Sequence, residues 1–361
     1  MFQLNRLSFF KKNNALIGDN GIFLKYSEII DYSKKIKKKI KKKKTFILLI
    51  SENTIGSILF YISSMINNHV IIFIDSKSKL KDIRSIEKTY RPAYIVAPDN
   101  WIKKNNKKKY KICLGLFETT MVKTKYRDIK INKNLSMLLP TSGSLGSKKY
   151  VRISKKNIES NTIAIIKYLK INSQDKAITN MPFNYSYMLS ILNTHLYSGA
   201  SLYVTQNSML QKSFWDFFKA NKITSINGVP YIYEILLKLG LKNVYHSKLK
   251  YFTQAGGKLE IKLIKKIFSF TNKKMIKFFT MYGQTEASPR MTYLLHKSKK
   301  KLGSIGKTLD KSKIWLVDEN EKKINQQNVS GELVFKGEGV SMGYANNYKD
   351  LNKGDENKKI L

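Results

Sequence analysis

The 361-residue sequence contains one cysteine, four histidines and no long apolar run. A single cysteine, Cys113, excludes an intrachain disulfide framework and a zinc site built from cysteines of this chain. The histidines are scattered without the spacing of metal ligands. No stretch reaches about 18 uninterrupted apolar residues, so the sequence predicts no transmembrane helix. The first ten residues lack the apolar region and cleavage site of a secretion signal, and we therefore expect a cytoplasmic location.

Arginine is also scarce, because only six of the 67 basic residues are arginine. The net charge of +42 is of the size that nucleic-acid-binding proteins carry. Base recognition relies on arginine, however, and the lysines here are spread over the whole chain. A compositional drift toward lysine, isoleucine and asparagine explains the charge more simply, so we expect no nucleic-acid partner. A nucleic-acid-binding protein remains the alternative that charge alone supports.

The first part of the chain alternates short apolar runs with helical stretches. Strands are expected at residues 45–50, 70–74, 93–96 and 137–139, and helices at 29–40, 53–67, 79–90 and 155–169. Alternation at this spacing predicts a parallel, doubly wound sheet. Ligands bind to such sheets at the carboxyl ends of the strands.

A second alternating set follows, and the pattern then changes near Gly303. Strands are expected at 176–179, 201–205, 250–254 and 278–282, and helices at 188–197, 212–220 and 231–239. Short strands at 313–317 and 331–336 indicate a small β region. The predicted fold is α/β, with two doubly wound, mainly parallel sheet subdomains at about 1–170 and 171–295. A small β-barrel-like subdomain at 296–361 completes it.

The stretch richest in residue types that can bind an anion follows the expected strand at 137–139. It consists of hydroxyls, glycines and lysines between Thr141 and Lys149. Glycines let backbone N–H groups approach an anion, hydroxyls donate hydrogen bonds to phosphate oxygens, and lysine supplies positive charge. The Walker pattern is absent. The stretch is therefore interpreted either as a phosphate-binding loop or as a Ser/Gly surface turn between a strand and a helix.

A second constellation, Tyr282-Gly283-Gln284-Thr285-Glu286, follows the expected strand at 278–282. An aromatic side chain can stack on a base, and a carboxylate can hold Mg²⁺ beside substrate phosphates. Placed next to the first loop, these residues would complete a site for a nucleoside triphosphate. The simpler interpretation is a strand end with an exposed acid.

The combined motifs resemble those of the acyl-adenylate-forming, or AMP-binding, enzymes. This family includes acyl-CoA synthetases, peptide-synthetase adenylation domains and firefly-type luciferases. Thr141-Ser142-Gly143-Ser144-x-Gly146-x-x-Lys149 is similar to its phosphate loop, and Tyr282-Gly283-x-Thr285-Glu286 to its second core motif. Gly256-Gly257 resembles its adenine-pocket loop. Gly303-Ser304-Ile305-Gly306 and Gly331-Glu332-Leu333, followed by Gly337, Val340 and Gly343-Tyr344, resemble the stretch that enters its small barrel. The ordered motifs span nearly the whole chain.

The resemblance implies an acid–thiol ligase that works in two steps. A carboxylate attacks the α-phosphate of ATP, giving acyl-AMP and pyrophosphate, and a thiol then accepts the acyl group. ATP and Mg²⁺ would be required, with coenzyme A or phosphopantetheine as the acceptor. The implied partners are a small carboxylic acid and either an acyl-carrier protein or a separately encoded C-terminal domain. Attack on a polyanion depends more on charge neutralisation and in-line placement than on a general base.

The resemblance also assigns roles by position. The implied catalytic residues are Lys149, Thr285 and Glu286. The ATP phosphates would be bound by Thr141, Ser142, Gly143, Ser144, Gly146 and Lys149. Adenine and AMP would be bound by Gly256, Gly257, Tyr282, Gly283, Gln284 and Thr285. Mg²⁺ would be bound by Thr141 and Glu286. The acyl pocket would contain Tyr185, Met188, Gly228 and Val229, and Tyr185 can equally be a core tyrosine with one bonded hydroxyl.

Two departures from the family pattern stand out. Leu145 occupies a position where the family has a hydroxyl residue, which removes one phosphate donor. The β region is also expected to be incomplete, since the family's ribose-binding aspartate would fall after Leu361 and its mobile C-terminal domain would be absent. A truncated, catalytically impaired ATP-binding remnant is therefore the alternative to an active ligase.

Overall fold

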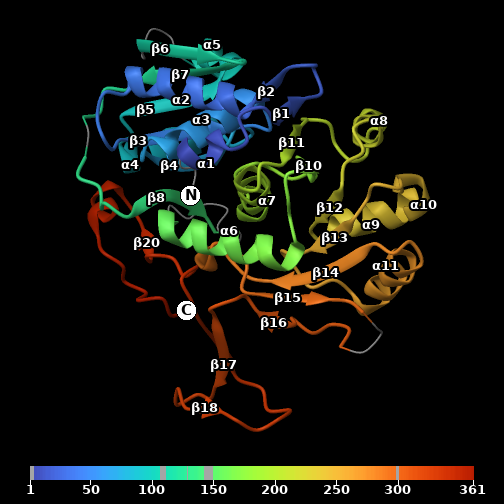
Figure 1. Ribbon diagram of the computed structural model, residues 1–361. Coiled ribbons are helices and arrows are strands. Elements are labelled where there is room, and N and C mark those ends of the chain that lie inside the picture. The colour runs from blue at the N-terminus through green and yellow to red at the C-terminus, as the bar shows by residue number, and fades with distance from the viewer. Residues whose placement is uncertain (1–3, 106–110, 128, 142–148, 298–300) are drawn as a thin grey trace.

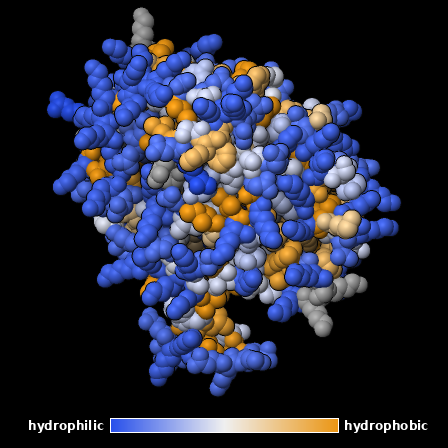
Figure 2. All heavy atoms as spheres, viewed as in Figure 1, coloured by the Kyte–Doolittle hydropathy of each residue, from blue (hydrophilic) through white to orange (hydrophobic). Residues whose placement is uncertain are grey.

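The computed structural model describes residues 4–105, 111–127, 129–141, 149–297 and 301–361 (Figure 1). Within these residues the strands form four sheets, with helices between and around them. Figure 2 shows hydrophilic side chains over most of the visible face, as expected for a chain with 67 basic residues. In the part of the chain that is described, no helix combines the length and apolar character needed to cross a membrane.

The main sheet carries the first half of the chain and has the order β20-β9-β8-β4-β3-β5-β7-β6. Its strands are β20 (Tyr344–Ala345), β9 (Tyr150–Ser154), β8 (Leu135–Pro140), β4 (Val70–Asp75), β3 (Phe46–Ser51), β5 (Tyr94–Pro98), β7 (Thr119–Lys123) and β6 (Lys111–Leu116). Strands β8, β4, β3 and β5 are parallel, and antiparallel strands extend both edges. The centre of this sheet is thus the doubly wound arrangement that the sequence predicts.

Both faces of the main sheet are covered, which explains why β3 is apolar at nearly every position. Ile47 and Leu49 belong to the core that includes helix α3 (Ile55–Ile66). Leu48 and Ile50 belong to the core on the other face, with helix α4 (Leu80–Tyr90). Helix α2 (Tyr26–Lys39) packs outside α3, where the Ser33 and Ser63 hydroxyls are hydrogen-bonded at 2.9 Å. A strand buried on both faces loses the polar alternation of a half-exposed strand.

The second sheet has the order β12-β13-β14-β15-β16. Its strands are β12 (Ser225–Gly228), β13 (Tyr251–Gln254), β14 (Lys277–Tyr282), β15 (Thr292–Leu295) and β16 (Lys307–Thr308). The first of these, β12 to β14, are parallel, and β15 and β16 continue the sheet antiparallel. One apolar cluster joins the sheet to helices α8 (Lys212–Ala220), α9 (Pro230–Leu239) and α11 (Ile261–Lys273). The carboxyl ends of β13 and β14 therefore lie side by side.

A third sheet links the start of the chain to its second half. It has the order β10-β11-β1-β2, with strands β10 (Lys176–Ile178), β11 (Ser201–Val204), β1 (Asn14–Gly18) and β2 (Phe23–Lys25). Helices α6 (Lys155–Leu169) and α7 (Ser186–Tyr197) lie between the sheets in Figure 1. The Tyr61 hydroxyl of α3 donates to Asn193 Oδ1 of α7 at 2.9 Å, with both side chains buried. The main sheet and the second half therefore share one core.

A small antiparallel sheet projects from the body at the bottom of Figure 1. It has the order β18-β17-β19, with strands β18 (Lys323–Ile324), β17 (Lys313–Val317) and β19 (Glu332–Lys336). The remaining elements are α1 (Leu4–Ser8), α5 (Asp99–Asn105), α10 (Leu241–Val244) and the 3-10 helices η1 (Thr285–Ala287) and η2 (Tyr348–Asn352).

The α/β class, with mixed parallel sheets and a small antiparallel sheet, is confirmed. Helix α11 and the antiparallel strands β9, β15, β16 and β20 are additions to the sequence-based expectation. The subdomain limits near residues 170 and 295 stay a prediction. Main-chain pairing crosses them, because β1 pairs with β11 and β20 pairs with β9.

One buried arginine attaches the last described segment to the main sheet. Arg152 of β9 is 0% exposed. Its guanidinium donates to the Glu356 carboxylate at 2.5 Å and to backbone carbonyls of residues 342–354. Those carbonyls belong to Met342, Tyr344, Asp350, Lys353 and Gly354. A buried charge needs such complete pairing, and the result is a fixed path for the segment that contains β20.

Candidate functional site

The stretch from Thr141 to Lys149 connects the antiparallel strands β8 and β9 of the main sheet. Pro140 and Tyr150 are partners in the ladder, so Thr141 and Lys149 face each other across the base of this loop. Strand β8 runs parallel to β4, which places the loop at the carboxyl end of a parallel strand, as predicted. The expected surface turn between a strand and a helix is wrong in one respect, because β9 intervenes before α6. Ser142, Gly143, Ser144 and Gly146 lie outside the described residues.

Lys149 and Glu286 both contact one tyrosine, Tyr344. The Lys149 ammonium lies over the Tyr344 ring, with Nζ 3.7 Å from the ring centroid. The Tyr344 hydroxyl donates to Glu286 Oε1 at 2.9 Å. Burial, followed by this hydrogen bond, raises the pKa of Tyr344 to about 12, so its hydroxyl stays a donor at neutral pH. A basic group and an acidic group that are 137 positions apart thus share one aromatic contact.

The loop after β14 holds Thr285 and Glu286 in the short helix η1. The backbone carbonyl of Glu286 accepts from Ser341 N at 2.7 Å. The Thr285 hydroxyl is 3.2 Å from the Ser186 hydroxyl at the start of α7, and Thr285 is buried. Gly283 is needed by close approach, because a Cβ there would lie 2.9 Å from Arg290 Cα and would overlap the Pro289 carbonyl oxygen. These contacts fix the backbone around Glu286, and the Tyr344 hydroxyl is hydrogen-bonded to its carboxylate.

A pocket of about 550 Å³ opens beside this loop, between the carboxyl ends of β13 and β14. It brings together both glycines after β13 and the Tyr282-Gly283 pair after β14, as the sequence predicts. Tyr282 is 39% exposed, so part of its ring is available for stacking. The full lining consists of Gln254, Gly256, Gly257, Lys258, Leu259, Ile264, Thr280, Met281, Tyr282, Gly283, Gly303, Ser304 and Ile305. A cavity of this size fits a nucleoside.

The predicted acyl-pocket residues divide into two groups. Tyr185 and Val229 meet at Gly256: a Cβ on Gly256 would overlap the Tyr185 hydroxyl and lie 3.0 Å from Val229 Cγ1. Tyr185 is half-buried, and burial raises its pKa. Gly228 and Met188 lie deeper. A Cβ on Gly228 would come 2.5 Å from Ile232 Cγ2, and Met188 is 0% exposed, so both are explained by packing in this conformation.

Hard oxygen ligands are present where the sequence predicts a magnesium site. The Glu286 carboxylate is half-buried, and Thr141 stands at the base of the neighbouring loop. Mg²⁺ prefers such oxygens and takes its other ligands from water and substrate phosphates. In the described ranges no group of three or more His, Cys, Asp or Glu side chains forms a protein-only metal site. The donor set therefore fits Mg²⁺ bound together with a polyphosphate.

Several site residues carry no signal of their own in the sequence. Gln254, Lys258 and Thr280 line the pocket, and Ser186 contacts Thr285. The sequence marks Tyr344 only as part of a glycine-tyrosine pair, whereas the structure places it in contact with both Lys149 and Glu286. Gln284 is exposed on the same loop and is not among the residues that line the pocket.

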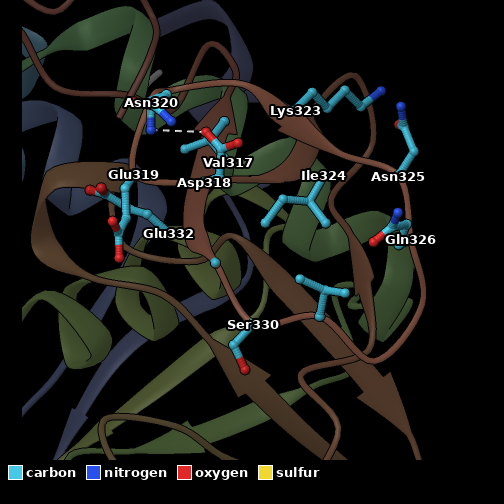
Figure 3. Close-up of a pocket in the computed structure, with 12 residues that line it drawn as sticks. Val317, Asp318, Glu319, Asn320, Lys323, Ile324, Asn325, Gln326, Ser330 and Glu332 are labelled. Atoms are coloured by element: carbon cyan, nitrogen blue, oxygen red, sulfur yellow. Dashed lines mark hydrogen bonds between the residues drawn. The ribbon is translucent and has the colours of Figure 1, made fainter.

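A larger hollow of about 920 Å³ lies on the projecting small sheet (Figure 3). It contains none of the predicted site residues and is formed by β17, β18 and the turns that join them to β19. Asn320 N donates to Asp318 Oδ1 at 2.9 Å within one of these turns, so the turn satisfies its own polar groups. Among the described residues, this hollow shares no lining residue with the pocket at the carboxyl ends of β13 and β14.

Comparisons with known proteins agree with the motifs. The family model described as "AMP-binding enzyme" matches residues 26–345. The oxalate–CoA ligase of Saccharomyces cerevisiae is 26% identical over 220 residues, covering 60% of this chain and 39% of the relative. The 2-succinylbenzoate–CoA ligase of Listeria monocytogenes is 21% identical over 311 residues, covering 84% of this chain and 59% of the relative. The chain thus spans less than two thirds of either ligase.

A solved structure supports the fold. The Klebsiella oxytoca NpsA N-terminal subdomain, in complex with 3-hydroxybenzoyl-AMSN, superimposes with a TM-score of 0.74 at 16% identity. The match covers 95% of this chain and 88% of that one. At this identity the likeness concerns the fold alone.

Proposed function

The chain belongs to the AMP-binding enzyme family, and we propose that it activates a carboxylic acid with ATP to give an acyl-adenylate. The observation that carries the proposal is the convergence of two loops at one pocket. The glycines after β13 and the Tyr282-Gly283 pair after β14 line a cavity of about 550 Å³. Glu286 follows on the same loop and reaches Lys149 through Tyr344.

In this proposal the nucleoside occupies the pocket and the triphosphate extends toward the loop at Thr141. Tyr282 stacks on adenine, and the absence of side chains at Gly256 and Gly257 lets the purine approach the backbone. Lys149 neutralises phosphate charge as the pyrophosphate leaves. Glu286 and Thr141 hold Mg²⁺, which neutralises charge on the phosphates when bound. Thr285, anchored to Ser186, donates its hydroxyl toward the α-phosphate.

The reaction then needs an oxygen of the acid in line with the leaving pyrophosphate. The acid carboxylate attacks the α-phosphorus, a new P–O bond forms, and the bond to pyrophosphate breaks. Tyr185 and Val229 lie against Gly256, and their resemblance to residues of the family's acyl pocket assigns them to the acyl part of the acid. The residues of this chain supply placement and charge neutralisation rather than a general base.

The second half-reaction is proposed by analogy with the oxalate–CoA and 2-succinylbenzoate–CoA ligases, which both use coenzyme A. A thiol, from coenzyme A or from phosphopantetheine on a carrier protein, would take the acyl group and release AMP. Further parts of the relatives' length would contribute to this step, because the chain covers 39% and 59% of them. An acyl-carrier protein or a separately encoded C-terminal domain is the corresponding partner.

The experiment that tests the first step is exchange of radiolabelled pyrophosphate into ATP over a panel of aliphatic and aromatic acids. We expect exchange that depends on one class of acid and on Mg²⁺. The panel should be run with and without a C-terminal domain from a related ligase. Absence of exchange with every acid in both series would contradict the proposed activity.

A specific observation favours a second candidate, an ATP-binding protein without turnover. Leu145 replaces a hydroxyl residue in the phosphate loop, which removes one donor to a charged group. In that case calorimetry would detect ATP binding while exchange stayed at background. Substituting Leu145→Thr and finding exchange restored would identify the loop as the cause.

A further inference from the structure

Tyr344 contacts two opposite charges, Lys149 through the face of its ring and Glu286 through its hydroxyl. Lys149 Nζ is 3.7 Å from the ring centroid, and Glu286 Oε1 is 2.9 Å from the hydroxyl. Among the ion pairs of the described residues, none joins Lys149 to Glu286. In the described structure both charges thus contact the same tyrosine and do not pair with each other.

The backbone of Tyr344 is fixed by contacts that involve neither charge. Tyr344 pairs with Val151 between β20 and β9, and its carbonyl accepts from Arg152 Nε at 3.0 Å. The preceding Gly343 has φ +99°, and a Cβ there would lie 2.6 Å from Glu356 Oε2. A residue other than glycine would be strained at this angle and would collide with the Arg152–Glu356 pair. The position of the tyrosine is thus built into the sheet.

A lysine and a carboxylate at one phosphate site work against each other when they pair. The attraction between them grows as water is excluded, so a pair formed by the exposed Lys149 and the half-buried Glu286 would compete with an incoming polyanion and its cation. An aromatic face holds an ammonium more weakly than a carboxylate does, because it carries no net charge. A phenol hydroxyl orients a carboxylate with one hydrogen bond and leaves its other acceptor positions available.

We propose that Tyr344 is a positioning residue that keeps Lys149 and Glu286 from neutralising each other. Both groups then stay available, the lysine to a polyphosphate and the carboxylate to its divalent cation. This inference rests on the proposed function, because it takes ATP as the ligand of the site. It adds a reason for an aromatic residue with a hydroxyl at this position, beyond packing.

The test measures ATP affinity by calorimetry in EDTA. Under these conditions Glu286 has no metal to bind, and Lys149 is the side chain expected to contribute to ATP affinity. Tyr344→Leu removes the ring and the hydroxyl, so Lys149 and Glu286 can pair. We expect about a fivefold loss of Mg²⁺-free ATP affinity, the size of one competing ion pair. Tyr344→Phe keeps the ring under the Lys149 ammonium, and its affinity should stay within about twofold of the unsubstituted protein.

A rescue separates this role from a general loss of structure. In Tyr344→Leu, adding Glu286→Gln removes the competing charge and frees Lys149. Glu286→Gln alone also favours an anion, so the comparison is a double-mutant cycle. The gain from Glu286→Gln should be about threefold larger in the Tyr344→Leu background than in the unsubstituted protein, since only there does it release the lysine.

The chain offers a matched control four residues along. Tyr348 is also half-buried and also lies under a cation, with Arg91 Cζ 4.1 Å from its ring centroid. Tyr348→Leu should leave Mg²⁺-free ATP affinity unchanged. Equal ATP affinity in Tyr344→Leu and the unsubstituted protein, or additive effects in the cycle, would overturn the inference while the proposed function stands. Failure of the unsubstituted protein to bind ATP at all would overturn the proposed function itself.

Discussion

Two cations three residues apart on one hairpin, Lys149 and Arg152, have opposite surroundings. Arg152 is 0% exposed and its guanidinium is saturated by backbone carbonyls and Glu356. Lys149 stands at the base of a loop with its ammonium over an aromatic ring. Arg152 is fully paired within the fold, whereas Lys149 is exposed and is the cation that the proposed function assigns to phosphate. Charge alone therefore says little about function in a chain with 67 basic residues.

Arg152 and Lys149 are linked through one chain segment, so the buried cation determines the surroundings of the exposed one. Arg152 fixes the path of residues 342–356, and Tyr344 on that path touches Lys149. A saturated arginine has the planar, multiply bonding geometry that holds carbonyls in place. A lysine is a flexible point charge that can follow a phosphate. The residue types match the two tasks.

The largest expected effect is on stability, from Arg152→Met. Removing the guanidinium leaves several buried carbonyls and the Glu356 carboxylate without their donor. We expect the free energy of unfolding to fall by about 3–5 kcal/mol, as when one partner of a buried pair is removed. Urea denaturation followed by circular dichroism measures it.

The matched control is Lys149→Met, the same chemical change at the other cation. Its free energy of unfolding should stay within about 0.5 kcal/mol of the unsubstituted protein, because the side chain lies at a loop end. Equal losses of unfolding free energy in Arg152→Met and Lys149→Met would contradict the contrast between a structural and an exposed cation.

The second largest effect is expected on MgATP binding, when Lys149 is substituted. Lys149→Ala should weaken MgATP binding by roughly ten- to a hundredfold, the value of a hydrogen bond to a charged group. Glu286→Ala should also weaken it, by removing a magnesium ligand. Lys149→Arg keeps the charge and should lose less. Isothermal calorimetry with MgATP measures all of them, and unchanged affinity in both alanine variants would contradict the site assignment.

The local parts of the fold could be predicted because their signals are local. Strand β3 and helix α3 lie where apolar runs and helical spacing place them. The loops after β8, β13 and β14 were also found, since glycines and polar residues end each strand. In the amphipathic helix α11, Ile264, Ile267 and Phe268 are buried, so its apolar spacing could have identified it.

The long-range parts could not be predicted, because their partners are distant in sequence. Strand β20 is two residues long and pairs with β9 nearly two hundred positions earlier. No residue near Tyr344 in the sequence indicates that Lys149 contacts its ring and Glu286 its hydroxyl. Met188 shows the converse, because a position that resembles a pocket residue is fully buried in the core. Topology, rather than composition, decides such cases.

The smallest expected effect tests what saturates Arg152. Glu356 is 49% exposed, and its Oε2 lies 2.5 Å from Arg152 Nη2. A glutamine amide oxygen can accept the same hydrogen bond, and the carbonyl partners of Arg152 remain. Glu356→Gln should therefore lower the free energy of unfolding by about 1 kcal/mol or less, and the difference should shrink in high salt. A loss as large as that of Arg152→Met would mean that the charge pair, not the carbonyls, holds residues 342–356 against the sheet. The contrast between the two cations would then rest on Glu356 alone.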